Sequence, residues 1–251
     1  MPAMDGAMAI TKLITFTPAN AGTGRATIQG DVVVFDIATG ERRLVLDGPT
    51  ITARRTAAVS LLAAQELAPD KRGPLLIVGA GTQGRAHLDA FAQGLPIKEV
   101  FIASRSESSA NALADHARTL GLKATMVGNA SASLADCPLA VTCTPANGVV
   151  LDGRPRDDAF IAAVGSFTPK MAELGAKLCR HCAELGRVVV DTPEAVHEAG
   201  DLIQAGLDVE GFAVLRDAIA EGRAGDGPVL FKSCGWAGWD LAAARTAFAA
   251  P

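Results

Sequence analysis

The sequence has no excess of positive charge. Its 251 residues include 23 Lys and Arg against 27 Asp and Glu, which gives a formal net charge of −4 at pH 7. A protein that binds a nucleic acid needs clustered cations to neutralise the phosphate backbone. We therefore expect no nucleic-acid partner, while a few local cations remain sufficient to hold a small anionic ligand.

Long apolar runs are also missing. A membrane-spanning helix needs about 20 consecutive apolar residues, and no stretch of the chain approaches that length. The first ten residues, MPAMDGAMAI, carry Asp5 where a secretory signal would carry a basic segment. We expect no membrane partner and a cytoplasmic location.

Cysteine and histidine are too few and too scattered to predict a metal site. The five cysteines lie mostly in apolar segments, which predicts reduced thiols. Cys179 and Cys182 form a C-x-x-C pair, but there is no second pair at zinc-finger spacing and no strand of the thioredoxin type before it. We interpret the four histidines as structural: His87, His116, His181 and His197.

What the sequence does contain is a clear change of pattern along the chain. Residues 9–17 and 27–37 read as strands, and 38–41 form a turn into a third strand at 42–48, which predicts a hairpin. A helix is predicted over 51–69, with Pro69 as its stop.

From residue 74 to 191, short apolar strands alternate with amphipathic helices. This pattern predicts an α/β fold with a doubly wound parallel sheet that is covered on both faces. Within it, a helix is expected from Met171 to Cys182. The remainder reads as helical, with one strand-like stretch at 227–233 and a last helix at 238–250.

This change of pattern predicts two domains, one inserted in the other. A Rossmann-type domain is expected at 73–192, and the flanking parts, 1–72 and 193–251, are expected to form one discontinuous α+β domain. The first part has too little sheet to bury its apolar face alone, which is why it is expected to pack with the last part.

The stretch LLIVGAGTQGRAHLDAF at 75–91 carries the strongest motif. Gly79, Gly81 and Gly84 follow a strand and open a helix at Thr82 or Gln83, which is the context that dinucleotide binding requires. The first glycine permits the tight turn, the second lets backbone amides approach a pyrophosphate, and the third lets helix and strand pack closely. The anion is expected at the helix N-terminus.

The next strand indicates which dinucleotide is bound. Enzymes that prefer NAD usually end this strand with an acid that accepts hydrogen bonds from the ribose, whereas this chain ends it with FIASRS. A hydroxyl and a guanidinium suit a 2′-phosphate, so Ser104, Arg105 and Ser106 favour NADPH, with NADH as the alternative. The competing interpretation is that Arg105 is a surface residue paired with Glu107.

Two arginines lie where a helix is expected to begin. With Thr50 or Thr52 as the cap, Arg54 and Arg55 fall in the first turn, where the helix dipole disfavours cations. Such a conflict with local propensity often marks function. We assign Arg55 an inward role in binding a carboxylate, with Arg54 directed to water; the alternative is that both lie on the surface.

Lys12 is the second cation of interest, because it interrupts the apolar strand AITKLITF. Strand alternation places it either on the solvent face or on the inner face. On the inner face, beside Arg55, its pKa would be lowered by the neighbouring cation, and it would then supply a proton as well as charge.

Several blocks of the chain together resemble the ornithine cyclodeaminase and mu-crystallin family. They are LDGPTITARRTAAVSLLAAQELAP, LLIVGAGTQGRAHLDAF, VTCTPANGVVLDG, VVVDTPEAVHEAGDLIQAG and VLFKSCGWAGWDLAAA, in that order. The resemblance implies a Rossmann domain inserted in a dimerisation domain that also shapes the substrate pocket. It therefore implies a homodimer.

The resemblance also implies roles for individual residues. Lys12 and Arg55 match residues that hold the substrate carboxylate, and Thr56 matches one near the nicotinamide. The remaining matches are cofactor contacts, in part shared with the glycine-rich motif: Gly79 to Gly84, Ser104, Arg105, Thr142, Cys143, Thr144, Val164, Phe231, Lys232 and Ser233.

The chain departs from the family pattern in two places. Cyclodeaminases carry an aspartate in the segment that matches VGSFTPKMAEL, and Phe167 stands there in this chain. A phenyl ring cannot transfer a proton or fix an ammonium, which disfavours deamination with ring closure. In addition, family members carry further elements before the point that matches Met1, including another carboxylate-binding arginine.

These observations predict a reductase that delivers hydride to a C=N bond. The branch most similar to this chain reduces the cyclic imino acids pyrroline-2-carboxylate and piperideine-2-carboxylate to proline and pipecolate. The alternatives are an ornithine cyclodeaminase, an enzyme of the alanine dehydrogenase type, and a non-catalytic NADPH-binding protein of the mu-crystallin type. Ser166 lacks the second glycine of a nucleophile elbow, which argues against a hydrolase.

Overall fold

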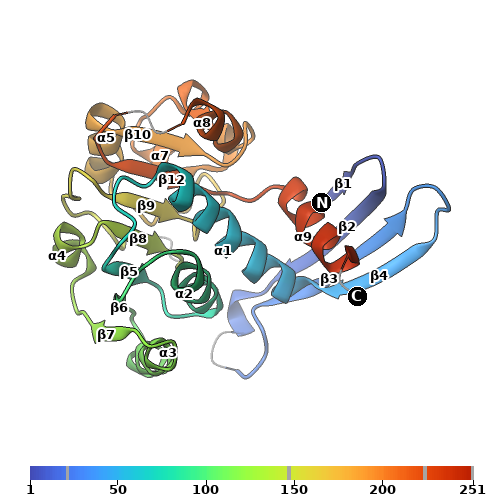
Figure 1. Cartoon of the computed structure of the whole chain (residues 1–251), viewed down its shortest axis with the longest axis horizontal. Helices are drawn as coiled ribbons and strands as arrows, with labels where there is room; N and C mark the ends of the chain where they lie inside the picture. The colour runs from blue at the N-terminus through green and yellow to red at the C-terminus, as the bar shows by residue number, and fades with distance from the viewer. Residues whose placement is uncertain (21–22, 146–147, 223–224, 250–251) are drawn as a thin grey trace. The chain divides into compact units, whose positions relative to one another are not determined.

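The chain folds into two compact units, which are coloured along the sequence in Figure 1. The computed structural model describes residues 1–20, 23–145, 148–222 and 225–249. Unit 1 comprises Met1–Thr56 and Trp236–Pro251, and unit 2 comprises Ala57–Gly235. Among the helices of these described ranges, none has the length and apolar character that crossing a bilayer requires.

Unit 1 is built on a four-stranded antiparallel sheet in which the strands follow their order in the sequence. On β2, Met8, Ile10 and Lys12 alternate onto the inner face. The last helix packs on this face, with Ala244 in the same apolar cluster as Ile10. The elements are β1 (Pro2–Met4), β2 (Met8–Phe16), η1 (Pro18–Asn20), β3 (Ile28–Asp36), β4 (Arg42–Asp47) and α9 (Ala237–Ala249).

The predicted hairpin is confirmed, but the helix after it begins earlier than expected. Helix α1 spans Gly48–Leu67. Its cap is Asp47, whose Oδ1 accepts a hydrogen bond from the backbone amide of Thr50 at 2.8 Å. Arg54 and Arg55 therefore lie beyond the first turn, and the predicted conflict with the helix dipole was wrong. The cause is that a carboxylate at the end of β4 caps the helix before either threonine is reached.

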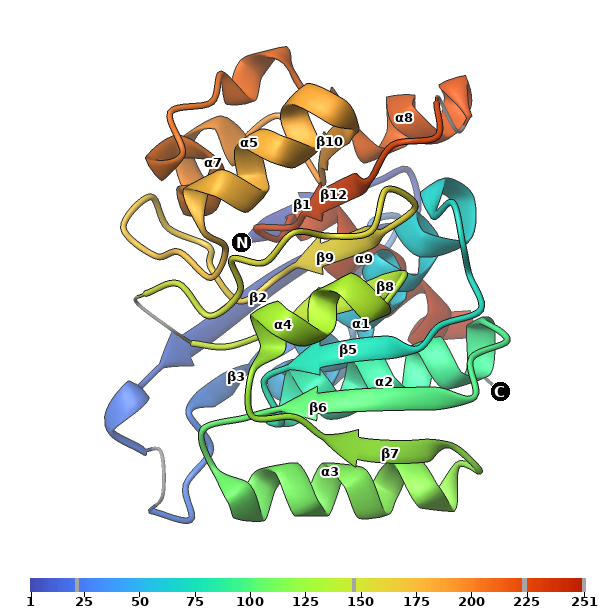
Figure 2. The same cartoon turned by 90° about the vertical axis from the view of Figure 1, so that its left-hand side faces the viewer.

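Unit 2 is built on an eight-stranded sheet in which every pairing is parallel, as Figure 2 shows for its central strands. The order is β11-β10-β12-β9-β8-β5-β6-β7. After β5 the chain adds β6 and β7 on one side of that strand and then returns to add β8 and β9 on its other side. The topological switch point therefore lies between β5 and β8. The strands are β5 (Leu75–Val78), β6 (Glu99–Ala103), β7 (Lys123–Met126), β8 (Leu139–Thr142), β9 (Phe160–Ala163), β10 (Arg187–Val190), β11 (Ala213–Val214) and β12 (Val229–Lys232).

Helices cover both faces of this sheet, which confirms the predicted α/β class. In Figure 1, α2 lies on the opposite face from α4 and α5. The sequence of β5 requires this cover on both faces, because its four residues are all buried and their side chains alternate toward the two helix layers. The helices are α2 (Thr82–Gly94), α3 (Glu107–Thr119), α4 (Ala130–Ser133), η2 (Leu134–Asp136), α5 (Ala176–Leu185), α6 (Ala195–Glu198), α7 (Gly200–Gln204), η3 (Val209–Gly211) and α8 (Leu215–Glu221).

The helix predicted from Met171 to Cys182 was wrong in its first part. Residues 171–175 are not helical, and α5 begins only at Ala176. Leu174 instead forms a parallel bridge with Leu151, and the amides of Glu173 and Leu174 donate to the carboxylate of Asp201. These contacts with distant parts of the chain hold the segment away from a helical conformation.

The two units are divided elsewhere than at the predicted boundaries. The second boundary lies after Gly235 rather than after 192, because β12 inserts between β9 and β10 of the parallel sheet. The first lies within α1, which starts in unit 1 and continues into unit 2. The last helix was predicted to reach residue 250, which lies outside the described residues.

Candidate functional site

The glycine-rich turn joins β5 to α2 at the carboxyl edge of the parallel sheet. Gly79 has φ of +114°, and its amide donates to the carbonyl of Ala103 at 2.9 Å. A Cβ at Gly84 would lie 2.0 Å from the carbonyl oxygen of Gly79, so any side chain there would force helix and strand apart. These two glycines are thus required by the fold of the turn.

Gly81 differs from the other two glycines, because a Cβ at this position would meet no atom within 4 Å. It is the N-cap of α2, and no side chain caps the helix there. The first amides of a helix need partners from outside it. The space in front of Gly81 therefore suits an anion that approaches the backbone, and the turn fits the pyrophosphate of a dinucleotide.

The residues after β6 are exposed and partly used for capping. Ser106 is the N-cap of α3 and accepts a hydrogen bond from the amide of Ser109 at 3.2 Å. Its own amide donates to the Ser104 hydroxyl. Arg105 is exposed, and it makes no ion pair with Glu107 in the part of the chain that the structure describes. The guanidinium therefore remains available to a ligand, and the surface pairing considered for it does not form.

Glu173 organises the segment that follows β8. Its carboxylate accepts hydrogen bonds from the hydroxyl of Thr142 at 3.1 Å, from the hydroxyl of Thr144 at 2.8 Å and from the amide of Gly165 at 2.6 Å. The amide of Thr144 also donates to it. Burial raises the pKa of Glu173, while the charge of Lys232 opposes that change. Glu173 was not predicted from the sequence, although it holds two of the predicted cofactor contacts.

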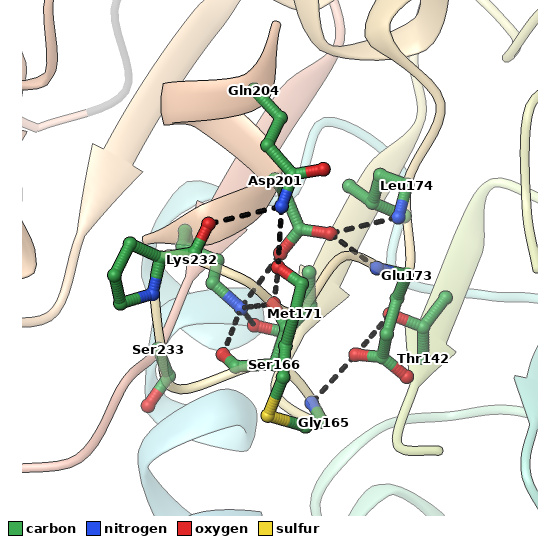
Figure 3. Close-up of polar contacts among 12 residues, drawn as sticks. Thr142, Gly165, Ser166, Met171, Glu173, Leu174, Asp201, Gln204, Lys232 and Ser233 are labelled. Carbon is green, nitrogen blue, oxygen red and sulfur yellow. Dashed lines mark hydrogen bonds and ion pairs between the residues drawn. The ribbon is translucent and has the colours of Figure 1, made fainter. Parts of the chain in front are cut away.

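Lys232 lies at the centre of a second buried network, drawn in Figure 3. Its Nζ is 2.9 Å from Asp201 Oδ2 and donates to the carbonyl of Ser166 at 2.6 Å and to its hydroxyl at 2.7 Å. Burial alone would lower the pKa of Lys232, but the charges of Asp201, Cys234 and Glu173 and the hydrogen bond to Asp201 together outweigh it, and the pKa is raised. Burial raises the pKa of Asp201, but the charge of Lys232 and the hydrogen bonds from Leu174, Ser166 and Lys232 together hold it below its usual value.

These two networks change the roles assigned to several predicted cofactor contacts. Thr142, Phe231 and Lys232 are all fully buried. The Lys232 ammonium is occupied by Asp201 and Ser166, so its side chain has no donor to offer a phosphate. What it does is hold the loop after β9, where Val164 and Gly165 are partly exposed at the carboxyl edge of the sheet.

Ser233 and Cys143 have similarly internal partners. The Ser233 hydroxyl donates to Asp191 Oδ2 at 2.8 Å. The Cys143 thiol donates to the carbonyl of Gly79 at 3.2 Å, which ties the end of β8 to the glycine-rich turn. Burial raises the pKa of this thiol well above its usual value.

The two predicted substrate cations come together in unit 1. Lys12 is 5% exposed on the inner face of β2, which confirms the inward alternative, and the Arg55 side chain is 10% exposed. Arg54 is exposed, as expected. Burial lowers the pKa of Lys12, and the charge of Arg55 lowers it further, as predicted. Thr56, next in α1, is 7% exposed.

Between these cations lies Asp240, which the sequence analysis missed. Its carboxylate is fully buried and accepts two hydrogen bonds from Lys12 Nζ, at 2.9 and 3.0 Å. Arg55 Nε lies 3.2 Å from Asp240 Oδ1 but without the direction of a hydrogen bond. The signal that was available is the charge itself, because Asp240 interrupts the apolar stretch GWAGWDLAAA just as Lys12 interrupts its strand.

The residues interpreted as structural are placed accordingly. His87 is fully buried, with its ring nitrogens on the carbonyl of Gln83 and the hydroxyl of Ser60, and burial lowers its pKa to about 4. Cys179 and Cys182 are both buried, and burial raises the pKa of Cys182 to about 12. Thiols that are protonated and inaccessible are poorly suited to redox exchange.

Two cavities in unit 2 lie away from these residues. One, of about 530 Å³, is lined by Arg154, Arg156 and Asp158 among others, and the second, of about 600 Å³, by His197 and Arg216 among others. None of the predicted cofactor contacts lines either cavity. Each unit thus carries its own group of candidate residues, which are the carboxyl edge of the sheet in unit 2 and the charged cluster in unit 1.

The sequence pattern of the ornithine cyclodeaminase/mu-crystallin family matches residues 1–249. The chain belongs to this family. It is 40% identical over 249 residues to delta(1)-pyrroline-2-carboxylate reductase 1 of Burkholderia multivorans, covering 98% of this chain and 78% of that protein. It is 39% identical, with the same coverage, to a delta(1)-pyrroline-2-carboxylate/delta(1)-piperideine-2-carboxylate reductase of Azospirillum brasilense.

A solved structure agrees with these sequence relatives. The delta(1)-pyrroline-2-carboxylate reductase of Thermococcus litoralis, determined in complex with NADH and L-proline, superposes with a TM-score of 0.88. The two chains are 26% identical, and the match covers 96% of this chain and 77% of that one. The fold described above is thus the fold of this family member.

Proposed function

We propose that the chain is an NAD(P)H-dependent reductase of cyclic ketimines, acting on pyrroline-2-carboxylate and piperideine-2-carboxylate to give proline and pipecolate. The observation that carries the proposal is the 40% identity to a pyrroline-2-carboxylate reductase over 98% of the chain. Two features of the structure support it: a glycine-rich turn with open space at Gly81, and a buried cationic pair, Lys12 and Arg55.

Unit 2 provides the contacts to the coenzyme. The amides at the start of α2 would hold the pyrophosphate, and the exposed Arg105 with Ser104 would hold a 2′-phosphate, which favours NADPH over NADH. The segment at Val164 and Gly165, where the amide of Gly165 donates to Glu173, would hold the nicotinamide end. When bound, the reduced nicotinamide supplies the hydride.

Unit 1 provides the contacts to the substrate. Arg55 and Lys12 bind the carboxylate of the imino acid, and this fixes the ring carbon that accepts the hydride. As that carbon is reduced, the π electrons of the C=N bond pass to nitrogen, which takes up one proton. The proton comes from the Lys12 ammonium, from an ordered water, or with a substrate that arrives as the iminium.

Phe167 supports reduction over cyclodeamination. It is 40% exposed and follows Ser166 in the loop after β9, where the cyclodeaminase pattern has an aspartate. The acids bonded to its two preceding residues, Asp201 and Glu173, are buried and accept hydrogen bonds from Ser166 and Gly165. The described residues of the loop itself, Val164 to Lys170, include no carboxylate that could handle the protons of a substrate amine.

We also propose that the protein is a homodimer through the outer face of the unit 1 sheet. Three apolar side chains stand out on this face: Met4 is 69% exposed, Leu13 75% and Val45 54%. They lie on β1, β2 and β4, opposite to the face that α9 covers. A run of exposed apolar residues across one sheet face is typical of a protein interface.

The test is to incubate the purified protein with NADPH and pyrroline-2-carboxylate while following the absorbance of the reduced coenzyme. Loss of that absorbance with formation of proline supports the proposal. Binding of NADPH without its consumption indicates a binding protein, and turnover only with alanine and NAD indicates an amino-acid dehydrogenase. Either of these results contradicts the proposal.

A further inference from the structure

Three charged side chains from distant parts of the chain are buried together in unit 1. Lys12 comes from β2, Arg55 from α1 and Asp240 from the first turn of α9. Their side-chain exposures are 3%, 10% and 0%. Two cations and one anion leave one positive charge uncompensated within this cluster. Burying a charge without a partner is costly, so this charge is suited to an anionic ligand.

The contacts within this cluster are unequal. Asp240 binds Lys12 through both carboxylate oxygens and so occupies two of the three N–H donors of the ammonium. Its shortest distance to Arg55 is 3.2 Å, from Oδ1 to Nε. Within the described residues of unit 1, neither Nη atom of Arg55 donates a hydrogen bond. The donors left over are one N–H of Lys12 and the Nη edge of Arg55.

We propose that Asp240 is a positioning residue for the reaction: it keeps the Lys12 ammonium charged and oriented and leaves the Nη edge of Arg55 to the substrate carboxylate. This inference rests on the proposed function for its catalytic consequence. The placement suits Asp240 itself, because a carboxylate in the first turn of α9 is stabilised by the helix dipole.

The charges around Lys12 show why it needs such a partner. Arg55 from α1 and burial both favour the neutral amine, and Asp240 from α9 is the group that opposes them. From β3 the cross-strand neighbour is apolar, Val32. On the side of β1, the Met1 amino group bonds the backbone carbonyl of Lys12 and not its side chain. Asp240 is thus the acid on which the charge of Lys12 depends.

Asp240→Asn tests this directly, because it removes the charge and keeps the shape. The pKa of Lys12 is measured in the protein without substrate, by NMR titration of lysine side-chain signals with Lys12 assigned through Lys12→Met. We expect the pKa of Lys12 to fall by about 1–2 units in Asp240→Asn. An unchanged pKa would overturn the proposal, and this readout does not depend on turnover.

The kinetic readout is the alkaline limb of kcat/KM for the cyclic imine, which we expect to move to lower pH by the same amount. The matched control is Asp5→Asn, which removes an ion pair to Arg245 of the same helix without touching Lys12. That variant keeps the wild-type profile. A uniform loss of kcat/KM in Asp240→Asn, with no displacement along the pH axis, would mean that Asp240 is only structural.

Two further variants separate the possible failures. In Lys12→Arg the cation no longer titrates, so the limb assigned to Lys12 is absent, and adding Asp240→Asn produces no displacement along the pH axis. Asp240→Glu keeps the charge, and we expect a lowered kcat/KM with an undisplaced limb; a displaced limb would contradict the proposal even if Asp240→Asn failed to fold. A wild-type protein that reduces no cyclic imine contradicts the proposed function. In that case the NMR titration still shows whether Asp240 raises the pKa of Lys12.

Discussion

Arg55 is the residue on which recognition of the substrate carboxylate most depends. Replacing it by Ala removes the guanidinium and leaves Lys12 and Asp240 as a neutral pair, with no net charge for an anion. A hydrogen bond to a charged group contributes about 1.5–3 kcal/mol, so we expect KM for the imino acid to rise about 10- to 100-fold. The apparent affinity for NADPH should change less than about 3-fold on that account, since Arg55 makes no predicted coenzyme contact.

Steady-state kinetics with each substrate varied in turn measure this difference. Arg54→Ala is the control, since Arg54 is the exposed neighbour in the same helix. Equal effects of Arg55→Ala on the two substrates would remove Arg55 from the carboxylate site.

Arg105 is the residue assigned to the coenzyme phosphate. In Arg105→Asp an acid replaces the exposed guanidinium after β6, as in proteins that bind the ribose hydroxyls of NAD. We expect the ratio of kcat/KM for NADPH to that for NADH to fall at least about 10-fold, since loss of a charge-assisted bond is joined by repulsion. Arg118→Asp, in the exposed last turn of α3, should leave the ratio unchanged. An unchanged ratio in Arg105→Asp would show that Arg105 does not read the phosphate.

The sequence was informative about single residues where a charge broke an apolar pattern. Lys12 was predicted in this way, and its inward position is confirmed. Arg55 was assigned through a helix start that proved wrong, because Asp47 caps α1. Asp240 carried the same kind of signal, but its partner Lys12 lies 228 residues away, and no local pattern connects them.

At the scale of elements, two glycines of the glycine-rich turn have different roles, since Gly84 is needed for folding and Gly81 for binding. A Cβ at Gly84 would lie 2.0 Å from the Gly79 carbonyl oxygen, whereas a Cβ at Gly81 meets only open space. We expect Gly84→Ala to lose about 1–3 kcal/mol of stability or more, as overpacking does. Gly81→Ala should unfold within a few degrees of the wild type, about the effect of a helix-cap change, and bind reduced coenzyme at least about 10-fold more weakly.

Thermal denaturation and a fluorescence titration with NADPH measure the two properties on the same samples. Gly121→Ala would be strained by its φ of +78°, so Gly128→Ala, where a Cβ also meets open space, is the matched control for both. Wild-type coenzyme affinity in Gly81→Ala would contradict an anion site at this turn.

The elements that could be predicted are those with a local signature. The strands β5 to β10 and the helices α2 and α3 follow from apolar runs and amphipathic spacing. The extended segment before α5 could not be predicted, because Glu173 and Leu174 are held by Asp201, far along the chain. Strand β11 has only two residues, too few for any periodic pattern.

At the scale of the whole molecule, stability should depend on pH through His87. Burial lowers its pKa to about 4 from an ordinary value of 6.5. Between these two pH values His87 is protonated in the unfolded chain and neutral in the folded chain. The free energy of unfolding therefore falls as pH falls from 6.5 to 4. The shift corresponds to a loss of about 3 kcal/mol at most.

Denaturant unfolding at several pH values measures this loss. In His87→Gln the slope of stability against pH in this window should become shallower, whereas His197→Gln, at an exposed site, should keep it. A slope that is the same in wild type and His87→Gln would contradict the assignment.

The oligomeric state is the second whole-molecule prediction. Leu13→Glu places a charge on the apolar outer face of the unit 1 sheet, at a side chain that is 75% exposed. We expect the dimer dissociation constant to rise at least about 30-fold, since an unpaired charge at an interface costs about 2 kcal/mol or more. Leu185→Glu, 64% exposed on α5 of unit 2, is the control. Sedimentation that shows the same species in all three proteins would contradict a dimer contact on this face.

The division of the molecule was only partly predictable. An inserted Rossmann-type sheet follows from the alternating pattern after residue 74, but β12 joins that sheet from beyond residue 192. Its parallel pairing with β9 and β10 is a contact between distant segments, and an apolar strand such as GPVLFKS reads alike in either domain. The inserted unit, Ala57–Gly235, is therefore longer than the range 73–192 that the alternating pattern predicts.

The central claim is that this chain transfers hydride to a cyclic imino acid whose carboxylate is held by Arg55. Its most direct test is the rate at which reduced nicotinamide is consumed with pyrroline-2-carboxylate, measured side by side for the wild type and Arg55→Ala. The account predicts consumption matched by proline formation in the wild type, with KM for the imine raised about 10- to 100-fold in the variant. A wild-type protein that binds NADPH but consumes none with this substrate would contradict it.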